Sequence, residues 1–93
     1  MTTSLAILLV THQSEALLPQ TLADVAALVP DEIRVADNAS TDASAALARR
    51  AGAQVISVGR NAGFAVAANI AARETRSDLL CFLNPDCRIT PAA

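Results

Sequence analysis

The sequence predicts an α/β fold, a three-layer sandwich in which helices cover both faces of a parallel sheet. Four short apolar segments alternate with three segments of helical spacing, and this βαβαβαβ order is typical of such a sheet. The first apolar segment, residues 5–10, contains no polar residue, as expected for a strand buried on both faces. With 93 residues, the chain has room for one such unit and no second domain.

The first helix is expected over residues 17–29. Pro19 suits a first helical turn, and apolar residues then recur on one face until Pro30, which cannot continue a helix. Residues 33–37 are rich in β-formers and end in a polar side chain, so they are expected to form the second strand.

The second helix is expected to begin at Ser40 or Thr41, because both are good N-cap residues, and to end at Gly52. Asp42 would then lie in the first helical turn, where the helix dipole favours an anion. Residues 54–58 are expected to form the third strand.

Asn61 is a candidate cap for a third helix that runs to about Glu74, and residues 79–83 are expected to form the fourth strand. The expected sheet order is 3-2-1-4. Ligands of parallel sheets bind beyond the carboxyl ends of the strands, so the functional residues are expected there.

The composition argues against several classes of protein. All seven cationic residues are Arg and no basic run occurs, so the charge pattern of a nucleic-acid binder is missing. Residues 5–10 are too short to span a membrane and the chain start lacks the positive charge of a signal peptide, which predicts a cytoplasmic location. Cys81 and Cys87 are expected to be reduced and structural.

Polar residues collect after each predicted strand, at residues 11–13, 37–38, 60–61 and 84–86. In a parallel sheet these four places share one edge. Together they offer hydrogen-bond acceptors, an Arg near phosphate, helix N-termini and a carboxylate for a divalent cation. This inventory indicates a site for a nucleoside diphosphate with a metal.

Three motifs resemble the successive signatures of family-2 glycosyltransferases: VADNASTD at residues 35–42, RNAGFA at residues 60–65 and LNPD at residues 83–86. The resemblance spans nearly the whole chain, and three motifs in order are far more specific than one. It implies a GT-A fold, whose Rossmann-like first half binds the nucleotide and whose second half binds the acceptor. Residues 1–93 would be the donor-binding half, without the acceptor-binding half.

By this resemblance, Thr11 and its neighbours would line the base pocket through backbone groups. Asp37 would accept a hydrogen bond from the pyrimidine N3–H. Taken alone, Asp37 fits equally well as a turn residue that bonds its own backbone. His12 is the only histidine, and it is expected to pack against the base, since a histidine without an orienting carboxylate is poor evidence of a general base.

The next motif places Arg60 near the phosphates, and Asn61 and Gly63 would shape the loop beside the donor. Their structural alternatives are an ordinary Asn cap and a poor helix residue. Asn69 follows Asn61 by eight residues, on roughly the same helical face, and matches an Asn of the family pattern. A solvated helix Asn is its alternative.

The last motif, with Asn84 and Asp86, occupies the place of the family's DxD-type motif. Asp86 is therefore the candidate ligand for Mg²⁺ or Mn²⁺, which would bridge the donor phosphates and assist departure of the diphosphate as a Lewis acid. A turn Asp after Pro is the alternative. Gln13, Ala43 and Ala71 stand where the family frequently has other residues.

The resemblance implies transfer of a sugar, with inversion, from a dTDP- or UDP-sugar to a hydroxyl of a saccharide or lipid-linked acceptor. The rhamnosyltransferase-like Asn-Pro-Asp variant favours dTDP-rhamnose, and polysaccharide or glycolipid assembly at the inner face of the membrane is the expected setting. No catalytic residue is assigned, because the base is expected in the missing half. The 93-residue chain alone is therefore expected to be inactive.

Other functions remain as alternatives. The chain could be a non-catalytic nucleotide-binding or assembly module, or an inactive fragment, and exposed edges of its small core could drive self-association. A dinucleotide-binding oxidoreductase is disfavoured because no GxGxxG follows the first strand. The absence of GK[ST] and of any Lys argues against a P-loop hydrolase and a phosphate-accepting receiver.

Overall fold

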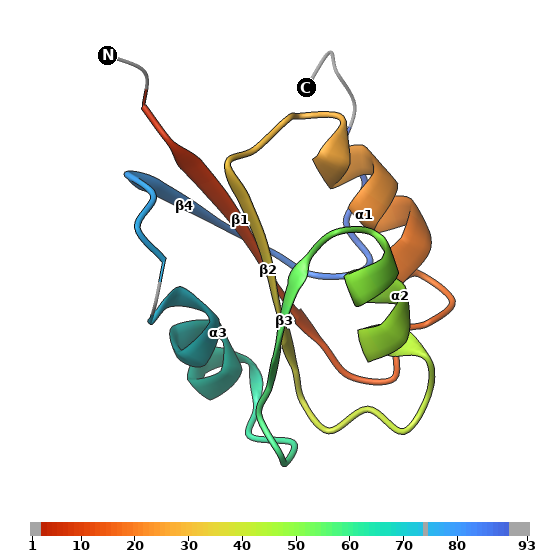
Figure 1. The fold of residues 1–93 in the computed structure, drawn as a ribbon. Coiled ribbons are helices and arrows are strands. Elements are labelled where there is room, and N and C mark those ends of the chain that lie inside the picture. Colours follow the sequence, from red (N-terminus) through yellow and green to blue (C-terminus); the bar gives the residue numbers. More distant parts are fainter. Residues whose placement is uncertain (1–2, 74, 90–93) are drawn as a thin grey trace.

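The computed structural model describes residues 3–73 and 75–89. Strands and helices alternate along the chain as predicted (Figure 1). Their order is β1 (Leu5–Thr11), α1 (Leu18–Ala26), β2 (Glu32–Asp37), α2 (Ser44–Arg50), β3 (Gln54–Ser57), α3 (Phe64–Ala72) and β4 (Leu79–Leu83).

The four strands form one parallel sheet in the order β3-β2-β1-β4, which confirms the predicted order. β1 lies in the centre and pairs with β2 and β4, and its last residue, Thr11, is in register with Asp37. On the other side of β2, Asp37 is in register with Ser57 of β3. Because all strands run the same way, their carboxyl ends meet at one edge.

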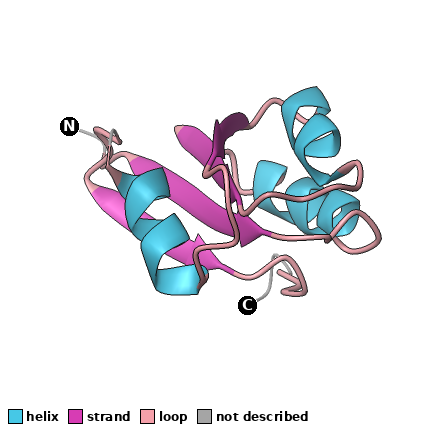
Figure 2. Ribbon diagram, turned by 90° about the horizontal axis from the view of Figure 1, so that it is seen from below, coloured by secondary structure: helices cyan, strands magenta, loops and turns pink. Residues whose placement is uncertain are grey.

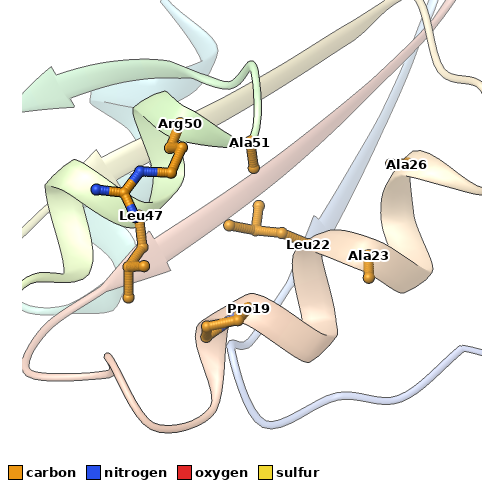
Figure 3. Close-up of a pocket in the computed structure, with 7 residues that line it drawn as sticks. All are labelled: Pro19, Leu22, Ala23, Ala26, Leu47, Arg50 and Ala51. Atoms are coloured by element: carbon orange, nitrogen blue, oxygen red, sulfur yellow. The ribbon is translucent and has the colours of Figure 1, made fainter.

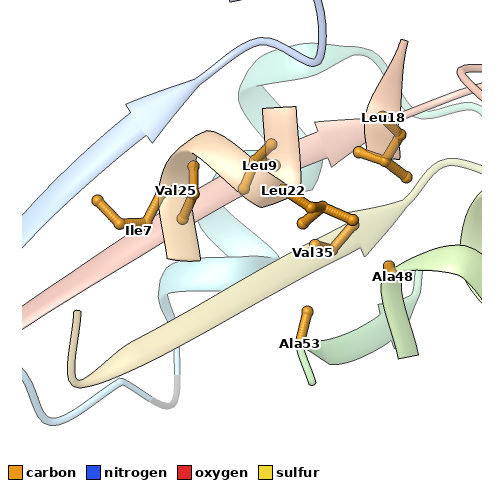
Figure 4. Packing of buried hydrophobic residues seen from close by; sticks show 8 residues of the cluster. All are labelled: Ile7, Leu9, Leu18, Leu22, Val25, Val35, Ala48 and Ala53. Atoms are coloured by element: carbon orange, nitrogen blue, oxygen red, sulfur yellow. The ribbon is translucent and has the colours of Figure 1, made fainter. Parts of the chain in front are cut away.

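Helices cover both faces of the sheet, so the three-layer α/β class is confirmed. α1 and α2 lie together on one face and α3 lies on the other (Figures 1 and 2). Successive side chains of a strand point to opposite faces, and helices cover both, which is why β1 is apolar from Leu5 to Val10. The first core cluster joins strands to α1 and α2 (Figure 4) and consists of Ile7, Leu9, Leu18, Leu22, Val25, Val35, Ala48 and Ala53.

The second core cluster, beneath α3, is built largely from alanine: Ala6, Leu8, Val10, Ala36, Ala67, Ala68 and Ala71. Small side chains let the helix approach the sheet closely but bury little apolar area per residue. The core on this face of the sheet is therefore thin.

Two predicted helix limits on the α1 and α2 face are wrong. α1 ends at Ala26, and Val29 lies beyond it with a φ of 51° and 84% of its surface exposed. A residue that precedes proline is disfavoured in helical backbone, so the helix stops before Val29. α2 begins at Ser44, so Ser40 and Thr41 are not its caps and Asp42 precedes its first turn.

The third helix also begins later than predicted. Gly63 is the N-cap residue of α3, in place of Asn61, and the last helical residue is Ala72. Glu74, the predicted end, lies outside the described residues. β3 ends at Ser57, one residue before its predicted end.

Cys81 and Cys87 are free and half-buried, and Cys81 packs against the first core cluster, as expected of a structural cysteine. Within residues 3–73 and 75–89, the structure contains no helix with the length and apolar character needed to cross a membrane.

Candidate functional site

Two buried polar side chains stand side by side at the carboxyl edge of the sheet. Thr11 is fully buried, and its register partner Asp37 is only 6% exposed. Neither Thr11 Oγ1 nor Asp37 Oδ1 has a hydrogen-bond partner among the residues that the structure describes. Buried polar atoms are almost always paired, so two unpaired oxygens at one edge point to a ligand that supplies donors. The Asp37 Oδ1 atom does not bond its own backbone as a turn residue would.

Asn38 connects the ends of β1 and β2 to the loop before α3. Its backbone N–H donates to Thr11 O at 2.8 Å, and its carbonyl oxygen lies 2.6 Å from His12 Nδ1, which must carry a proton to donate. Its side-chain Nδ2 donates to Gly63 O and its Oδ1 accepts from Ala62 N–H, both at 3.3 Å. Asn38 is 3% exposed. Asn38 lies within the VADNASTD motif, but no local feature of the sequence predicts these contacts.

Gln13 joins the loop after β1 to the loop after β2. Its Oε1 accepts from the N–H groups of Thr41 and Asp42 at 2.7 and 3.2 Å, and its Nε2 donates to Thr41 Oγ1 at 2.8 Å. Its own N–H donates to Ser40 Oγ at 2.9 Å. Ser40 and Thr41 therefore bind Gln13 and do not cap α2. The sequence places Gln13 among the polar residues after the first strand and marks it as a departure from the family pattern, but it does not predict these bonds between the loops.

The next residues continue this contact between the two loops. Ser14 N–H donates to Ser44 Oγ at 2.9 Å, Glu15 N–H donates to Asp42 Oδ2 at 3.1 Å, and Ala43 N–H donates to Glu15 Oε2 at 3.2 Å. The Ser44 hydroxyl and the backbone N–H groups of Ser44 and Glu15 hold the pKa of the Asp42 carboxyl below its ordinary value. These hydrogen bonds hold the loop after β1 against the loop after β2, next to the carboxyl edge where Thr11 and Asp37 lie.

Arg60, Asn61 and Gly63 lie in the exposed loop between β3 and α3. Gly63 has a φ of 83°, a conformation that other residues adopt only with strain, while a Cβ there would meet nothing within 4 Å. Backbone conformation, not close approach of another protein group, is therefore what requires glycine. Asn61 Oδ1 accepts from Gly63 N–H at 3.5 Å, so it shapes the turn before the helix.

Asn69 is not brought to the strand ends. It is an exposed residue of α3, about 8 Å along the helix axis from Phe64 at the helix start, using the standard rise per residue. The predicted shared helical face of Asn61 and Asn69 is wrong, because Asn61 precedes the helix. A binding role for Asn69 stays a prediction.

Asn84 and Asp86 lie in a β-turn directly after β4. Cys87 N–H donates to Asn84 O at 3.0 Å, which makes Pro85 and Asp86 the central residues of the turn. The turn alternative thus describes the backbone at Asp86 correctly. Both Asn84 and Asp86 are exposed, so their side chains are free to meet a ligand at this edge.

The donor chemistry of Asp86 fits a cation that binds together with a diphosphate. Among residues 3–73 and 75–89, no group of three or more His, Cys, Asp or Glu side chains could hold a metal ion. Mg²⁺ sites commonly use one or two carboxylates, with phosphate oxygens and waters completing the shell. One carboxylate oxygen from Asp86 suits such a shared site and not a site made of protein groups alone.

A cavity among the described residues lies elsewhere, in a groove between α1 and α2 (Figure 3). Its volume is about 300 Å³ and its lining is mostly apolar: Pro19, Leu22, Ala23, Ala26, Leu47, Arg50 and Ala51. These residues belong to the helical layer and not to the carboxyl edge, so the groove is separate from the candidate site.

A four-stranded parallel sheet with helices on both faces defines the chain as an α/β unit, and its unpaired, buried polar atoms lie at the carboxyl edge. Residues 6–93 match the model of glycosyl transferase family 2, and the chain belongs to this family. The family resemblance and the GT-A fold class inferred from the sequence are thereby confirmed. No curated protein matches the sequence.

Comparison with solved structures also supports the GT-A fold. Mannosyl-3-phosphoglycerate synthase from Rubrobacter xylanophilus superposes with a TM-score of 0.83 at 25% identity, covering 96% of this chain and 33% of that one. Glucosyl-3-phosphoglycerate synthase from Mycobacterium tuberculosis, in complex with UDP, gives 0.76 at 26% identity, covering 91% and 34%. S. aureus TarS shares the fold, with a TM-score of 0.77 at 21% identity over 90% of this chain and 17% of that one.

The chain thus spans about a third of the length of the two synthases. The M. tuberculosis enzyme has also been crystallised with Mn²⁺, UDP and glucosyl-3-phosphoglycerate; in that form it covers 92% of this chain and 36% of its own, at 24% identity and a TM-score of 0.76.

Proposed function

We propose that this chain is the donor-binding unit of a glycosyltransferase that uses a pyrimidine nucleotide-diphosphate sugar. The pair of buried, unpaired oxygens on Thr11 and Asp37 at the carboxyl edge carries this proposal. A pyrimidine base that presents N3–H to Asp37 Oδ1 would satisfy an acceptor that the protein leaves unpaired. The similarity to a UDP-bound synthase supports UDP, and dTDP remains the second donor to be tested.

The surrounding residues would orient the donor. Asn38 holds the Ala62–Gly63 backbone against the strand ends. Arg60 belongs to the same loop, two residues before Ala62, and would extend toward the donor phosphates. The Arg60 guanidinium is suited to bind phosphate oxygens. His12 is anchored to Asn38 O through Nδ1, so its ring can lie against the base without a proton-transfer role.

Asp86 would bind a divalent cation jointly with the donor diphosphate. The bound cation would supply Lewis-acid stabilisation of the charge that develops on the leaving diphosphate. Since the solved synthases are about three times as long as this chain, we assign the acceptor site and the base that deprotonates the acceptor hydroxyl to further polypeptide. Inversion, and a saccharide or lipid-linked acceptor, follow from the family resemblance.

Calorimetric titration of UDP, and separately dTDP, tests the base site. An analogue methylated at N3 lacks the donor, so it should bind the wild-type chain about tenfold to a hundredfold more weakly, the usual worth of a hydrogen bond to a charged group. The Asp37→Ala variant should bind UDP more weakly than the wild type by the same factor, and it should no longer distinguish UDP from the methylated analogue. Asp31→Ala is the matched control, because it removes a carboxylate near the amino ends of the strands.

Equal binding of UDP and its N3-methyl analogue by a folded wild-type chain would contradict the assignment of Asp37. Failure of both nucleotides to bind would favour an assembly module over a donor site.

An assembly role has one observation in its favour, the exposed edge strand β4. Leu80 and Phe82 are in register with Ala6 and Leu8, on the face that α3 covers over β1 and β2. They remain 41% and 44% exposed. Exposed apolar edge strands favour pairing with another chain. We propose that two copies associate through β4, in addition to donor binding.

A further inference from the structure

The turn that contains Asp86 is hydrogen-bonded to helix α1, although the two segments are more than sixty residues apart in the sequence. Figure 1 shows the blue segment after β4 passing beside the orange helix α1. Surface turns usually expose their backbone groups to water. Here two side chains of α1, from Thr21 and Asp24, contact the main chain on both sides of Asp86.

Thr21 is 1% exposed, and its hydroxyl contacts the backbone carbonyls of the two residues that flank Asp86. Its Oγ1 lies within hydrogen-bonding distance of Pro85 O and lies 3.1 Å from Cys87 O. A hydroxyl has one proton and donates to one carbonyl at a time. Helical Thr side chains often bond the carbonyl four residues earlier, yet that contact, to Leu17 O, is the longest of the three at 3.4 Å.

Asp24 holds the main chain immediately after the turn. Its Oδ2 accepts from Ile89 N–H at 3.1 Å and from Arg88 Nε at 2.7 Å. The Asp24 side chain is 12% exposed, whereas the Arg88 side chain is 62% exposed. The backbone bond therefore lies in the more protected position, and charge assistance strengthens it. Thr21 and Asp24 are three residues apart and share one face of α1.

We propose that Thr21 and Asp24 are positioning residues for the divalent cation, which hold the backbone of the Asp86 turn so that its carboxylate has one orientation at the carboxyl edge. The inference rests on the proposed function. A site with one protein carboxylate depends strongly on how well that carboxylate is oriented. Residues that orient metal ligands typically change metal affinity about tenfold to a hundredfold when they are mutated.

The experiment measures the gain in UDP affinity that Mn²⁺ produces, by calorimetry on the purified chain with and without Mn²⁺. Electron paramagnetic resonance of Mn²⁺ in the presence of UDP gives a second readout of the bound ion. Thr21→Val removes the hydroxyl and keeps the shape, Thr21→Ser restores the hydroxyl, and Asp24→Asn removes the charge. Asp78→Asn is the matched control, because Asp78 also accepts a backbone N–H, from Ser4 at 3.0 Å, but at the amino ends of the strands.

Thr21→Val and Asp24→Asn are expected to lower the Mn²⁺-dependent gain about tenfold or more, the usual effect of losing a group that orients a ligand. UDP affinity without Mn²⁺ should stay unchanged in both, and Thr21→Ser and Asp78→Asn should behave as wild type. If Thr21→Val lowers UDP affinity equally with and without Mn²⁺, the hydroxyl serves only the fold and the inference is wrong.

Two further outcomes separate this inference from the proposed function. If Asp86→Ala loses the Mn²⁺-dependent gain while Thr21→Val and Asp24→Asn keep it, the inference falls and the donor site stands. If the wild-type chain binds UDP but gains nothing from Mn²⁺, the cation assignment of Asp86 and the positioning role fall together, while the base site of Asp37 stands.

Discussion

Replacing Asn38 with Ala is expected to destabilise the chain and to release the loop before α3. The substitution removes two side-chain hydrogen bonds at 3.3 Å, to Gly63 O and from Ala62 N–H, and leaves the backbone bond to Thr11 O in place. Asn38 is 3% exposed, so water replaces the lost partners poorly at its own position. The freed loop groups are closer to solvent, which reduces the cost.

The magnitude follows from these two bonds. An intramolecular hydrogen bond contributes about 0.5–1.5 kcal/mol net, so two bonds give about 1–3 kcal/mol of lost unfolding free energy. For a domain of this size, each kcal/mol lowers Tm by about 4–8 °C. A fall of about 4 °C marks the lower limit of the expectation.

Urea and thermal unfolding followed by circular dichroism measure the change, and hydrogen exchange at the Ala62 amide reports the loop directly. Asn38→Asp keeps the acceptor for Ala62 N–H but places a carboxylate against Gly63 O, so it should lose the donor bond without restoring stability. An unchanged Tm in Asn38→Ala, with the Ala62 amide still protected, would refute the reasoning that Asn38 holds this loop.

Two other predictions concern acid stability and self-association. Hydrogen bonds lower the pKa of four carboxyl groups in the folded chain below their ordinary values: Asp24, Glu32, Asp42 and Asp78. The stability that these groups contribute is therefore present above about pH 4 and is lost as the pH falls through the lowered values. Urea unfolding between about pH 7 and pH 3 should show this loss, and unchanged stability would contradict it. Phe82→Lys should shift the sedimentation of the chain toward that of a monomer, because a charge on the exposed edge strand opposes pairing. If the wild-type chain is already monomeric at high concentration, the proposed association through β4 is wrong.

The sequence alone determined the architecture. The unbroken apolar run of β1 required burial on both faces, and alternation of strands with helices required a parallel sheet whose carboxyl ends meet. These features depend on periodicity and composition, which are local properties of the chain. For the same reason the polar residues after each strand could be placed at one edge, and the three motifs were enough to recognise the family that the comparison then confirmed.

The helix starts and the fine geometry of the site were decided by contacts between segments distant in sequence. Ser40 and Thr41 have the chemistry of caps, yet Gln13 occupies their hydrogen-bonding groups from the loop after β1. In the same way Asn38 binds the backbone just before α3, where Gly63 takes the N-cap position expected for Asn61. A capping preference is local, and a partner folded against the same groups overrides it.

The hydrogen bonds that hold the Asp86 turn are the clearest example of contacts that the local sequence does not predict. Nothing near Asp86 in the sequence indicates that Thr21 and Asp24, more than sixty residues earlier, hold its main chain. Only the packing of α1 beside the end of β4 brings these groups within hydrogen-bonding distance. The sequence thus determined which polar residues follow the strands at the carboxyl edge. The tertiary structure decided which side chains hold them there, because those bonds form only after the helices have packed on the sheet.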